Sequence, residues 1–137
     1  MLPANKLPLG AVRDLSRCFP ARIVELRTTT VSSSGIKISA VEDGREIGHC
    51  YIYLIRNDLH AEPYALLEDV YVEESSRGRG VGTILVKKAV ELARELGCYK
   101  IIATSRFERK EVHKWYEKLG FELYGYEFRM NLKGMQR

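Results

Sequence analysis

The stretch "SRGRGVGT", residues 76–83, places three glycines and two arginines in eight positions, directly after the strand-like "ALLEDVYV" of residues 65–72. Glycines allow a loop to present backbone N–H groups with no side chain blocking the approach. The helix expected after the loop directs the positive end of its dipole to the same place. The stretch therefore predicts a site for a phosphate-bearing ligand, although a flexible basic turn would have the same composition.

Two common phosphate motifs do not fit this stretch. A Walker loop requires a Gly-Lys-Ser/Thr ending, and counting from Gly78 reaches Thr83 with no Gly-Lys pair. A dinucleotide fingerprint requires glycines at 78, 80 and 83, whereas the third glycine is at 82. The ligand therefore belongs to neither of these two classes.

The residues after the loop change from strand to helix periodicity. Apolar residues at helical spacing predict a helix over 80–97 that ends at Gly97; they are Val81, Leu85, Ala89, Leu92 and Leu96. "CYKIIATS", residues 98–105, is typical of a buried strand. Ser105 and Glu108 have the spacing of a capping box, which predicts a second helix that ends at Gly120.

The remaining segments have strand composition. Strands are expected over 21–31, 35–43, 49–57 and 64–72, with Asp43-Gly44 as a hairpin turn, and one or two strands over 121–132. We therefore predict an α/β (α+β mixed) fold: a mostly antiparallel sheet with a parallel strand pair at its centre, flanked by helices. A chain of 137 residues is the size of a single domain, 1–137, with residues 1–20 as an N-terminal segment.

Composition narrows the class of protein. The net charge of +4 suits an anionic ligand but is too small and too dispersed to indicate nucleic acid. Three cysteines, Cys18, Cys50 and Cys98, lack metal-site spacing and indicate free thiols in a reducing compartment. Neither a signal peptide nor an apolar run of about 20 residues is present, so we expect a cytoplasmic protein with no membrane partner and no metal.

Two motifs together resemble one family. The pattern Arg77-x-x-Gly80-x-Gly82 before an amphipathic helix is similar to the pyrophosphate-binding motif of the GNAT superfamily of N-acetyltransferases, and "HKWYEKLGF", residues 113–121, resembles its second signature. The resemblance implies an acetyl-CoA-binding core over 64–125, in which acetyl-CoA wedges between two splayed parallel strands. It also implies that acetyl-CoA is the acetyl donor.

The resemblance assigns residues to acetyl-CoA. The backbone of Val70, Tyr71 and Val72 would pair with the pantetheine, with the N–H of Val70 facing the thioester carbonyl. The pyrophosphate would lie on Arg77, Gly78, Arg79, Gly80, Val81, Gly82 and Thr83. Ser105 and Arg109 are further expected contacts, and the sequence leaves open whether Arg109 reaches a CoA phosphate or faces solvent.

Acetyl transfer to an amine needs an acid for the departing thiolate and a route for the proton of the amine. Tyr116 resembles the general acid of the family, although it also lies on the apolar stripe of its helix. Glu68 resembles the family's base or amine anchor, with Asp69 second; alternation sends adjacent strand residues to opposite faces unless a bulge intervenes. A solvated carboxylate at a strand end is the alternative for Glu68.

The acceptor is left open. The predicted function is transfer of an acetyl group to a primary amine by direct attack, with the oxyanion stabilised by the backbone of 67–72. "GCYKII" and "WYEKLGF" resemble glucosamine-phosphate N-acetyltransferases, and Arg129 on the last predicted strand would add charge at such an acceptor site. Polyamines, amino-acid amines and a peptide N-terminus are alternatives, as is a non-catalytic CoA-binding regulatory domain. Two helices that many relatives insert after their first strand have no room here, so the acceptor site is open or completed by a second subunit of a homodimer.

Overall fold

The computed structural model describes residues 23–134, and its contacts divide the chain into two units, Met1–Val31 and Ser32–Arg137. In the first unit, the described residues 23–31 have no regular secondary structure and are exposed. The strand predicted over 21–31 is therefore wrong for 23–31, and its first two positions lie outside the described residues. A strand pattern forms a strand only where a partner edge is available.

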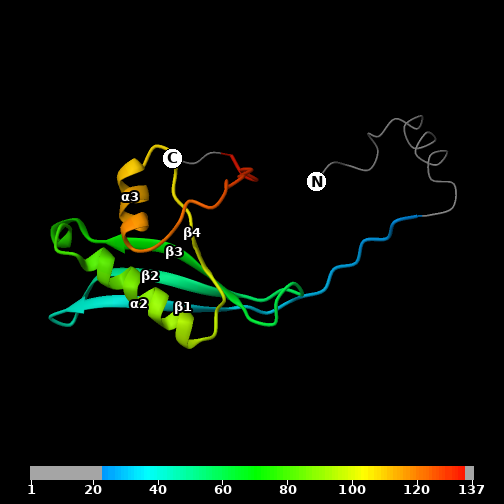
Figure 1. Cartoon of the computed structure of the whole chain (residues 1–137), viewed down its shortest axis with the longest axis horizontal. Helices are drawn as coiled ribbons and strands as arrows, with labels where there is room; N and C mark the ends of the chain where they lie inside the picture. Colours follow the sequence, from blue (N-terminus) through cyan, green and yellow to red (C-terminus); the bar gives the residue numbers. More distant parts are fainter. Residues whose placement is uncertain (1–22, 135–137) are drawn as a thin grey trace. The chain divides into compact units, whose positions relative to one another are not determined.

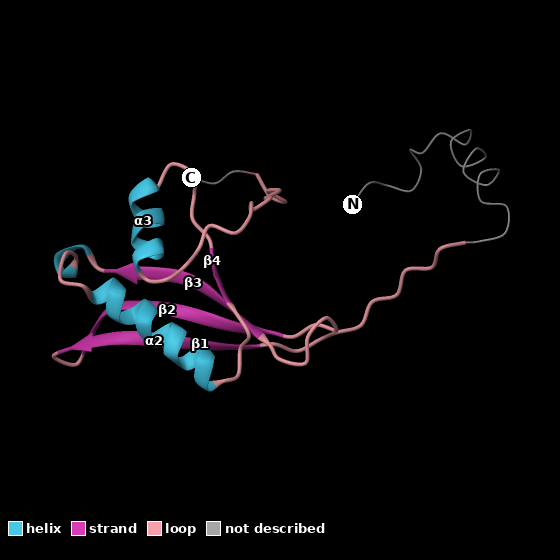
Figure 2. Cartoon of the chain, in the orientation of Figure 1, coloured by secondary structure: helices cyan, strands magenta, loops and turns pink. Residues whose placement is uncertain are grey.

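The second unit contains a four-stranded sheet in the order β1-β2-β3-β4. Its strands are β1 (Ser34–Glu42), β2 (Arg45–Ile55), β3 (Tyr64–Val72) and β4 (Ile101–Ala103); the helices are η2 (Glu74–Ser76), α2 (Val81–Glu95) and α3 (Lys110–Lys118). β1, β2 and β3 are antiparallel neighbours, and β4 is parallel to β3 (Figures 1 and 2). The mixed fold class predicted from the sequence is confirmed.

The β1–β2 turn has the predicted residues. Asp43 and Gly44 both have positive φ, at 52° and 76°, which is the geometry of the tight hairpin turns that match strand twist. The prediction of a hairpin at Asp43-Gly44 is confirmed.

The core lies between α2 and the sheet, because α2 packs across β1, β2 and β3. Ile52 and Cys50 of β2 meet Leu85, Val86 and Ala89 of α2, and all five are almost completely buried. Full burial of a side chain such as Ile52 or Leu85 contributes about 1.5–3 kcal/mol to stability. The core therefore holds α2, and with it the glycine-rich loop at its N-terminus, against the sheet.

The pairing of β3 with β4 covers only three of the nine residues of β3. Ala65, Leu66 and Leu67 pair with residues 101–103, and from Glu68 onward β3 has no partner in β4. The expected splayed parallel pair is therefore present. It lies at an edge of the described sheet rather than at its centre, because the strands expected after residue 120 are not formed.

Two predictions about the last part of the chain are wrong. Residues 122–132 form no strand, although apolar and polar side chains alternate along them, and their apolar side chains are exposed. The alternation gives strand propensity, but a strand also needs an adjacent edge to pair with. Ser105 does not cap α3: the chain makes a turn over 106–109, and Arg109 is the residue before the first helical one.

Candidate functional site

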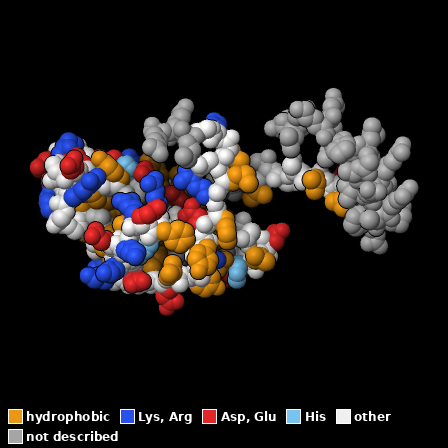
Figure 3. All heavy atoms as spheres, turned by 90° about the horizontal axis from the view of Figure 1, so that it is seen from above, with side chains coloured by type: hydrophobic (Ala, Val, Ile, Leu, Met, Phe, Trp, Pro, Cys, Tyr) orange, Lys and Arg blue, Asp and Glu red, His pale blue; other side chains and the backbone are white. Residues whose placement is uncertain are grey.

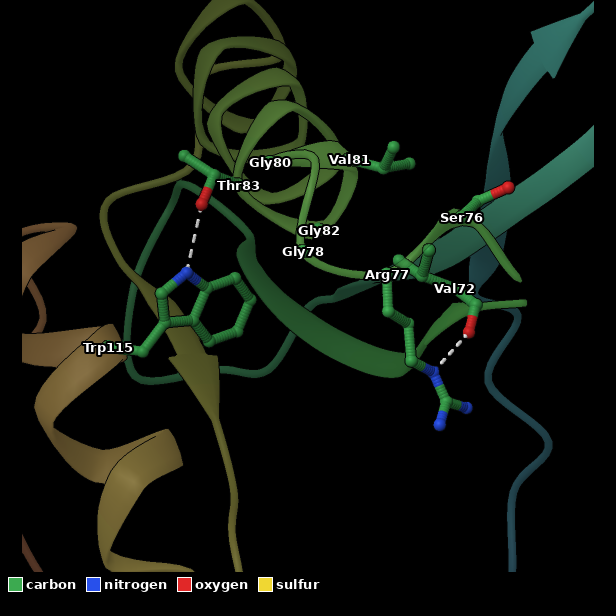
Figure 4. Close-up of a pocket in the computed structure, with 9 residues that line it drawn as sticks. All are labelled: Val72, Ser76, Arg77, Gly78, Gly80, Val81, Gly82, Thr83 and Trp115. Carbon is green, nitrogen blue, oxygen red and sulfur yellow. Dashed lines mark hydrogen bonds between the residues drawn. The ribbon is translucent and has the colours of Figure 1, made fainter. Parts of the chain in front are cut away.

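The glycine-rich loop forms a concave cradle of about 190 Å³ at the N-terminus of α2 (Figure 4). Gly78 and Gly80 have φ of 79° and 80°, the left-handed region that glycine adopts without strain. A Cβ atom at either position would meet nothing within 4 Å. The loop therefore needs glycine for its backbone, and the space above these two glycines is open to a ligand.

Residues from β3, the glycine-rich loop, the first turn of α2 and α3 line the cradle. Its lining residues are Val72, Ser76, Arg77, Gly78, Gly80, Val81, Gly82, Thr83 and Trp115. Ile84 donates the first intrahelical hydrogen bond, to Gly80, so the backbone N–H groups of Val81, Gly82 and Thr83 precede the helical ladder. Backbone N–H groups at a helix N-terminus bind anions.

The two arginines of the loop lie in different places. Arg77 lies at the cradle: its Nε donates to the carbonyl of Val72 at 2.8 Å, and its guanidinium lies 5.8 Å from the Tyr71 ring centroid. Arg79 pairs instead with Glu42, at 3.2 Å from Nη1, and lowers the pKa of that carboxyl. In this structure Arg77 therefore contributes charge at the cradle, and Arg79 contributes it to the neighbouring hairpin.

Trp115 joins α3 to the cradle, and sequence reasoning missed it as a site residue. Its Nε1 donates to Thr83 Oγ1 at 2.9 Å, and its ring would lie 3.5 Å from a Cβ placed on Gly82 (Figure 4). Its position next to Tyr116 in "HKWYEKLGF" was the available signal. This hydrogen bond connects α3 to the N-terminus of α2.

A second and larger cavity, of about 1030 Å³, opens where β3 and β4 separate. One wall is residues 67–72 of β3, and the opposite wall is residues 104–109 together with α3. The cavity brings together predicted site residues from both halves of the core: Glu68, Val70, Tyr71, Val72, Arg77, Gly82, Ser105, Arg109 and Tyr116. Arg77 and Gly82 also line the cradle, so the two spaces are adjacent.

A bulge in β3 brings both carboxylates to this cavity. Glu68 pairs with Tyr51 and Tyr71 with His49, so that Asp69 and Val70 together oppose a single residue of β2. Asp69 has φ of 49°, as expected of an irregular position in a bulge. Simple alternation would have separated Glu68 and Asp69; with the bulge, both line the cavity.

Tyr116 lies in a partly apolar environment. Its ring is 5.0 Å from that of Trp115 and 5.1 Å from that of Phe121, between centroids. Burial raises the pKa of the Tyr116 phenol, with smaller contributions in the same direction from Cys50 and Glu68, whereas Arg109 lowers it. The phenol is thus a proton donor across the neutral pH range.

The opposite wall contributes polar groups. Ser105 Oγ is buried and, among the described residues, accepts and donates no hydrogen bond. A buried hydroxyl without a partner is costly unless a ligand or water completes it. Arg109 also lines the cavity, and it is exposed.

A family model described as the acetyltransferase (GNAT) family matches residues 12–121. The chain belongs to the GNAT family of acetyltransferases.

Known proteins resemble this GNAT chain in sequence and in fold. It is 44% identical over 55 residues to a probable glucosamine 6-phosphate N-acetyltransferase 2 of Oryza sativa. The aligned region covers 40% of this chain and 31% of that protein. It is 28% identical over 102 residues to the aminoglycoside N(6')-acetyltransferase type 1 of Stenotrophomonas maltophilia, covering 72% and 67%. A putative acetyltransferase of Agrobacterium tumefaciens superimposes with a TM-score of 0.66 at 26% identity, covering 95% and 81%.

The match to the glucosamine 6-phosphate proteins is limited in length. The chain spans 31% of one such relative, from Oryza sativa, and 43% of another, from Trypanosoma brucei. The family assignment therefore covers the fold and the acetyltransferase class, and the acceptor is a separate question.

Two further residues of this GNAT domain line the larger cavity, Glu127 and Arg129. The sequence suggested Arg129 only as added charge and did not indicate Glu127. Their signal was weak, because both belong to the segment after residue 121 that does not form the expected strands.

The surface charge is mixed. On the face shown in Figure 3, acidic and basic side chains are interspersed rather than gathered into one basic patch. Over residues 23–134, no three His, Cys, Asp or Glu side chains cluster as metal ligands would. The helices described there are also too short or too polar to cross a bilayer.

Proposed function

We propose that this GNAT domain transfers the acetyl group of acetyl-CoA to a primary amine. The observation that carries the proposal is the junction of two spaces: a glycine cradle suited to phosphate, and an adjoining cavity lined by two carboxylates and a half-buried tyrosine. A phosphate-binding end next to an acid–base end is the arrangement that acetyl transfer from acetyl-CoA requires.

The donor side would be held mainly by backbone. The N–H groups of residues 81–83 and the guanidinium of Arg77 would bind the pyrophosphate, with Arg79 adding charge if it leaves Glu42. The unpaired half of β3 would offer backbone groups of Val70, Tyr71 and Val72 to the pantetheine. The buried hydroxyl of Ser105 and the side chain of Arg109 are available to the same arm.

The oxyanion of the tetrahedral intermediate would be stabilised by the backbone N–H of Val70. The bulge supports this role, because residues 69 and 70 have left the regular ladder with β2. Such preorganised donors act where charge develops in the transition state.

Tyr116 would give its proton to the departing CoA thiolate. Its raised pKa supports the role, because the phenol is protonated at the pH where the thiolate leaves. Hydrogen bonding to the sulfur supplies part of the effect, because a phenol near pKa ~10 is a weaker acid than a thiol near ~8.5.

Glu68 would anchor the ammonium group of the acceptor or take its proton through a water molecule, and Asp69 is the second candidate. Both are carboxylates at the same cavity. An alkylamine of pKa about 10.4 arrives protonated at neutral pH, so a negatively charged wall favours its binding.

We infer an amine on a sugar as the first acceptor class to examine. Two of the relatives are named for glucosamine 6-phosphate and for aminoglycosides, and both of these compounds are amino sugars. Glu68 and Asp69 suit the amine, and Arg129 suits an anionic substituent such as a sugar phosphate. Polyamines, amino acids and peptide N-termini are the comparison substrates.

We also propose a homodimer in the cytoplasm. The exposed apolar side chains of residues 123–132 support association, because large exposed apolar patches mark interaction sites. Light scattering after size exclusion measures the mass: about 31 kDa, twice the 15.7 kDa chain, is expected, and a monomer at micromolar concentration would contradict it.

The test is release of free CoA thiol from acetyl-CoA in the presence of each amine. Turnover with at least one amine, lowered by Tyr116→Phe and by Glu68→Gln, is the expected result. If acetyl-CoA binds but no amine supports turnover, the proposed reaction is wrong and a non-catalytic CoA-binding role replaces it.

A further inference from the structure

His49 of β2 lies directly behind one of the cavity carboxylates. Its Nε2 is 2.9 Å from Asp69 Oδ2, and its Nδ1 is 3.3 Å from Glu46 Oε2. The imidazole is 19% exposed, against 66% for Asp69. The ring is therefore sheltered, while the carboxylate that it contacts reaches the cavity.

Glu46 is fixed as a carboxylate. Lys37 Nζ lies 2.8 Å from its Oε1, and the hydroxyl of Ser39 donates to the same oxygen. The hydrogen bond from Lys37 is the largest cause that lowers the pKa of Glu46 to about 2. An ionised carboxylate only accepts hydrogen bonds, so His49 Nδ1 must carry a proton toward Glu46.

The opposite nitrogen then determines what His49 can do. With Nδ1 protonated, Nε2 of the neutral ring carries a lone pair, and the Nε2···Oδ2 contact at 2.9 Å has room for one further proton, either on the ring or on Asp69. An imidazole nitrogen is a stronger base than a carboxylate oxygen. A proton that reaches Asp69 from the acceptor therefore passes to Nε2.

The groups around His49 come from three strands. From β2, the ring of Tyr51 lies edge-on at 5.6 Å, and from β3, that of Tyr71 lies at 5.5 Å, between centroids. From β1, Ser39 is the cross-strand partner of His49, and the ammonium of Lys37, which pairs with Glu46, also attracts the carboxylate of Asp69. Arg77 lies beyond Tyr71, and Glu68 pairs with Tyr51 one step along the sheet.

We propose that His49 is a proton-relay and positioning residue, which acts through Asp69 to remove the proton of the acceptor amine. This inference rests on the proposed acetyl transfer and leaves Glu68 as the anchor of the ammonium. None of the roles proposed above for the reaction involves His49.

The protons balance as follows. The acceptor ammonium gives one proton to the Asp69 carboxylate, and Asp69 passes it to Nε2. The freed nitrogen lone pair forms the C–N bond with the acetyl carbon, and the C–S bond breaks. Of the two protons that the nitrogen loses, one replaces the proton that Tyr116 gives to the CoA sulfur, and the other leaves His49 for water.

Proton transfer by a positioned side chain contributes on the order of 10²–10⁴ in rate. His49→Gln keeps an N–H donor for Asp69 but cannot take a proton. We expect kcat to fall by about 10²-fold, within that range, with the KM for acetyl-CoA unchanged. The acidic limb of the kcat/KM profile should disappear with it.

His60→Gln is the matched control. His60 stacks on Tyr99 at 4.0 Å between centroids, and neither residue lines the cavity. This variant should keep both kcat and the acidic limb. If His49→Gln also keeps them, the relay is wrong.

A second measurement does not depend on activity. In ¹⁵N NMR of the histidine rings, Asp69→Asn should shift the Nε2 resonance of His49, because that nitrogen loses its carboxylate partner, and leave the resonances of His60 unchanged. An unchanged His49 resonance would overturn the proposal. A shifted His49 in a chain that acetylates no amine would overturn the acetyl-transfer function and the relay with it, leaving only a structural ion pair.

Discussion

The two halves of β3 do different work, although they are continuous in sequence. Residues 65–67 pair with β4 and include Ala65 and Leu67, which are almost completely buried. Residues 68–72 have left β4, carry the bulge and line the large cavity. The first part stabilises the fold. The second part exposes backbone groups and carboxylates, because no residue of β4 pairs with it.

The contrast is sharpest at two adjacent residues, Leu67 and Glu68. Leu67→Ala removes a side chain that is 3% exposed and should cost about 2–5 kcal/mol of the free energy of unfolding. Glu68→Gln, one residue on, should change that free energy by less than about 0.5 kcal/mol. Urea denaturation measures both.

Glu68→Gln should affect the activity much more than it affects the stability. Glu68→Gln should lower kcat/KM for the amine by about 10–100-fold, because a buried or cavity-facing charge partner is worth about 1.4–3 kcal/mol. Equal stability losses for the two variants would show that the halves of β3 are not distinct.

The next effect concerns the cradle beside the splayed half. Gly80→Glu places a side chain and a negative charge in open space where the pyrophosphate is proposed to lie. Acetyl-CoA should bind at least about 100-fold more weakly, which corresponds to about 2.7 kcal/mol. Isothermal titration calorimetry measures the Kd.

Gly97→Glu controls for backbone strain in that experiment. Gly97 has φ of 78°, close to the 80° of Gly80, and also has nothing within 4 Å of a Cβ, but it lies at the opposite end of α2. It should retain the parent affinity. A parent-like Kd for Gly80→Glu would mean that the phosphate assignment is incorrect.

Tyr116→Phe should lower kcat by about 10–100-fold, equivalent to about 1.4–2.7 kcal/mol, with little change in the Kd for acetyl-CoA. Because burial raises the pKa of the phenol, its proton is retained as the pH rises to about 10 and is lost only above its raised pKa. A pH–rate profile from 6 to 10.5 checks the sign. Loss of activity well below pH 10 in the parent, absent from the variant, would contradict this role.

The smallest effect concerns Arg79. Its pair with Glu42 is about half exposed on both sides, so solvent screens it and it contributes little to stability. Glu42→Gln should free Arg79 for the pyrophosphate and tighten acetyl-CoA binding by about 2–3-fold at low salt. If Arg79→Ala and Glu42→Gln both leave the Kd unchanged, Arg79 serves only the hairpin.

The sequence predicted the parts of the site that depend on local rules. Gly78 and Gly80 were recognisable because their backbone requires glycine, and the stripe of Val81, Leu85 and Ala89 because helical spacing buries one side of α2. These features are fixed within a few residues of chain.

The parts that depend on contacts between distant segments were not predictable. The Arg79–Glu42 pair, the Trp115–Thr83 bond and the His49–Asp69 contact each join residues 20 or more apart in sequence. The sequence allowed a bulge near Glu68 and Asp69 but did not predict one, because the register of β3 against β2 decides whether it forms. The segments 23–31 and 122–132 have strand-like sequences but form no strand, because a strand pattern alone does not supply a neighbouring strand to pair with.

The central claim is that acetyl-CoA occupies the cradle and the splayed half of β3. Backbone amide NMR of the parent protein during an acetyl-CoA titration tests it most directly. We predict saturable shifts at Val70, Val72 and residues 80–83, and unshifted amides at the paired residues 65–67. Saturable shifts that avoid the cradle, or equal shifts in both halves of β3, would contradict the account.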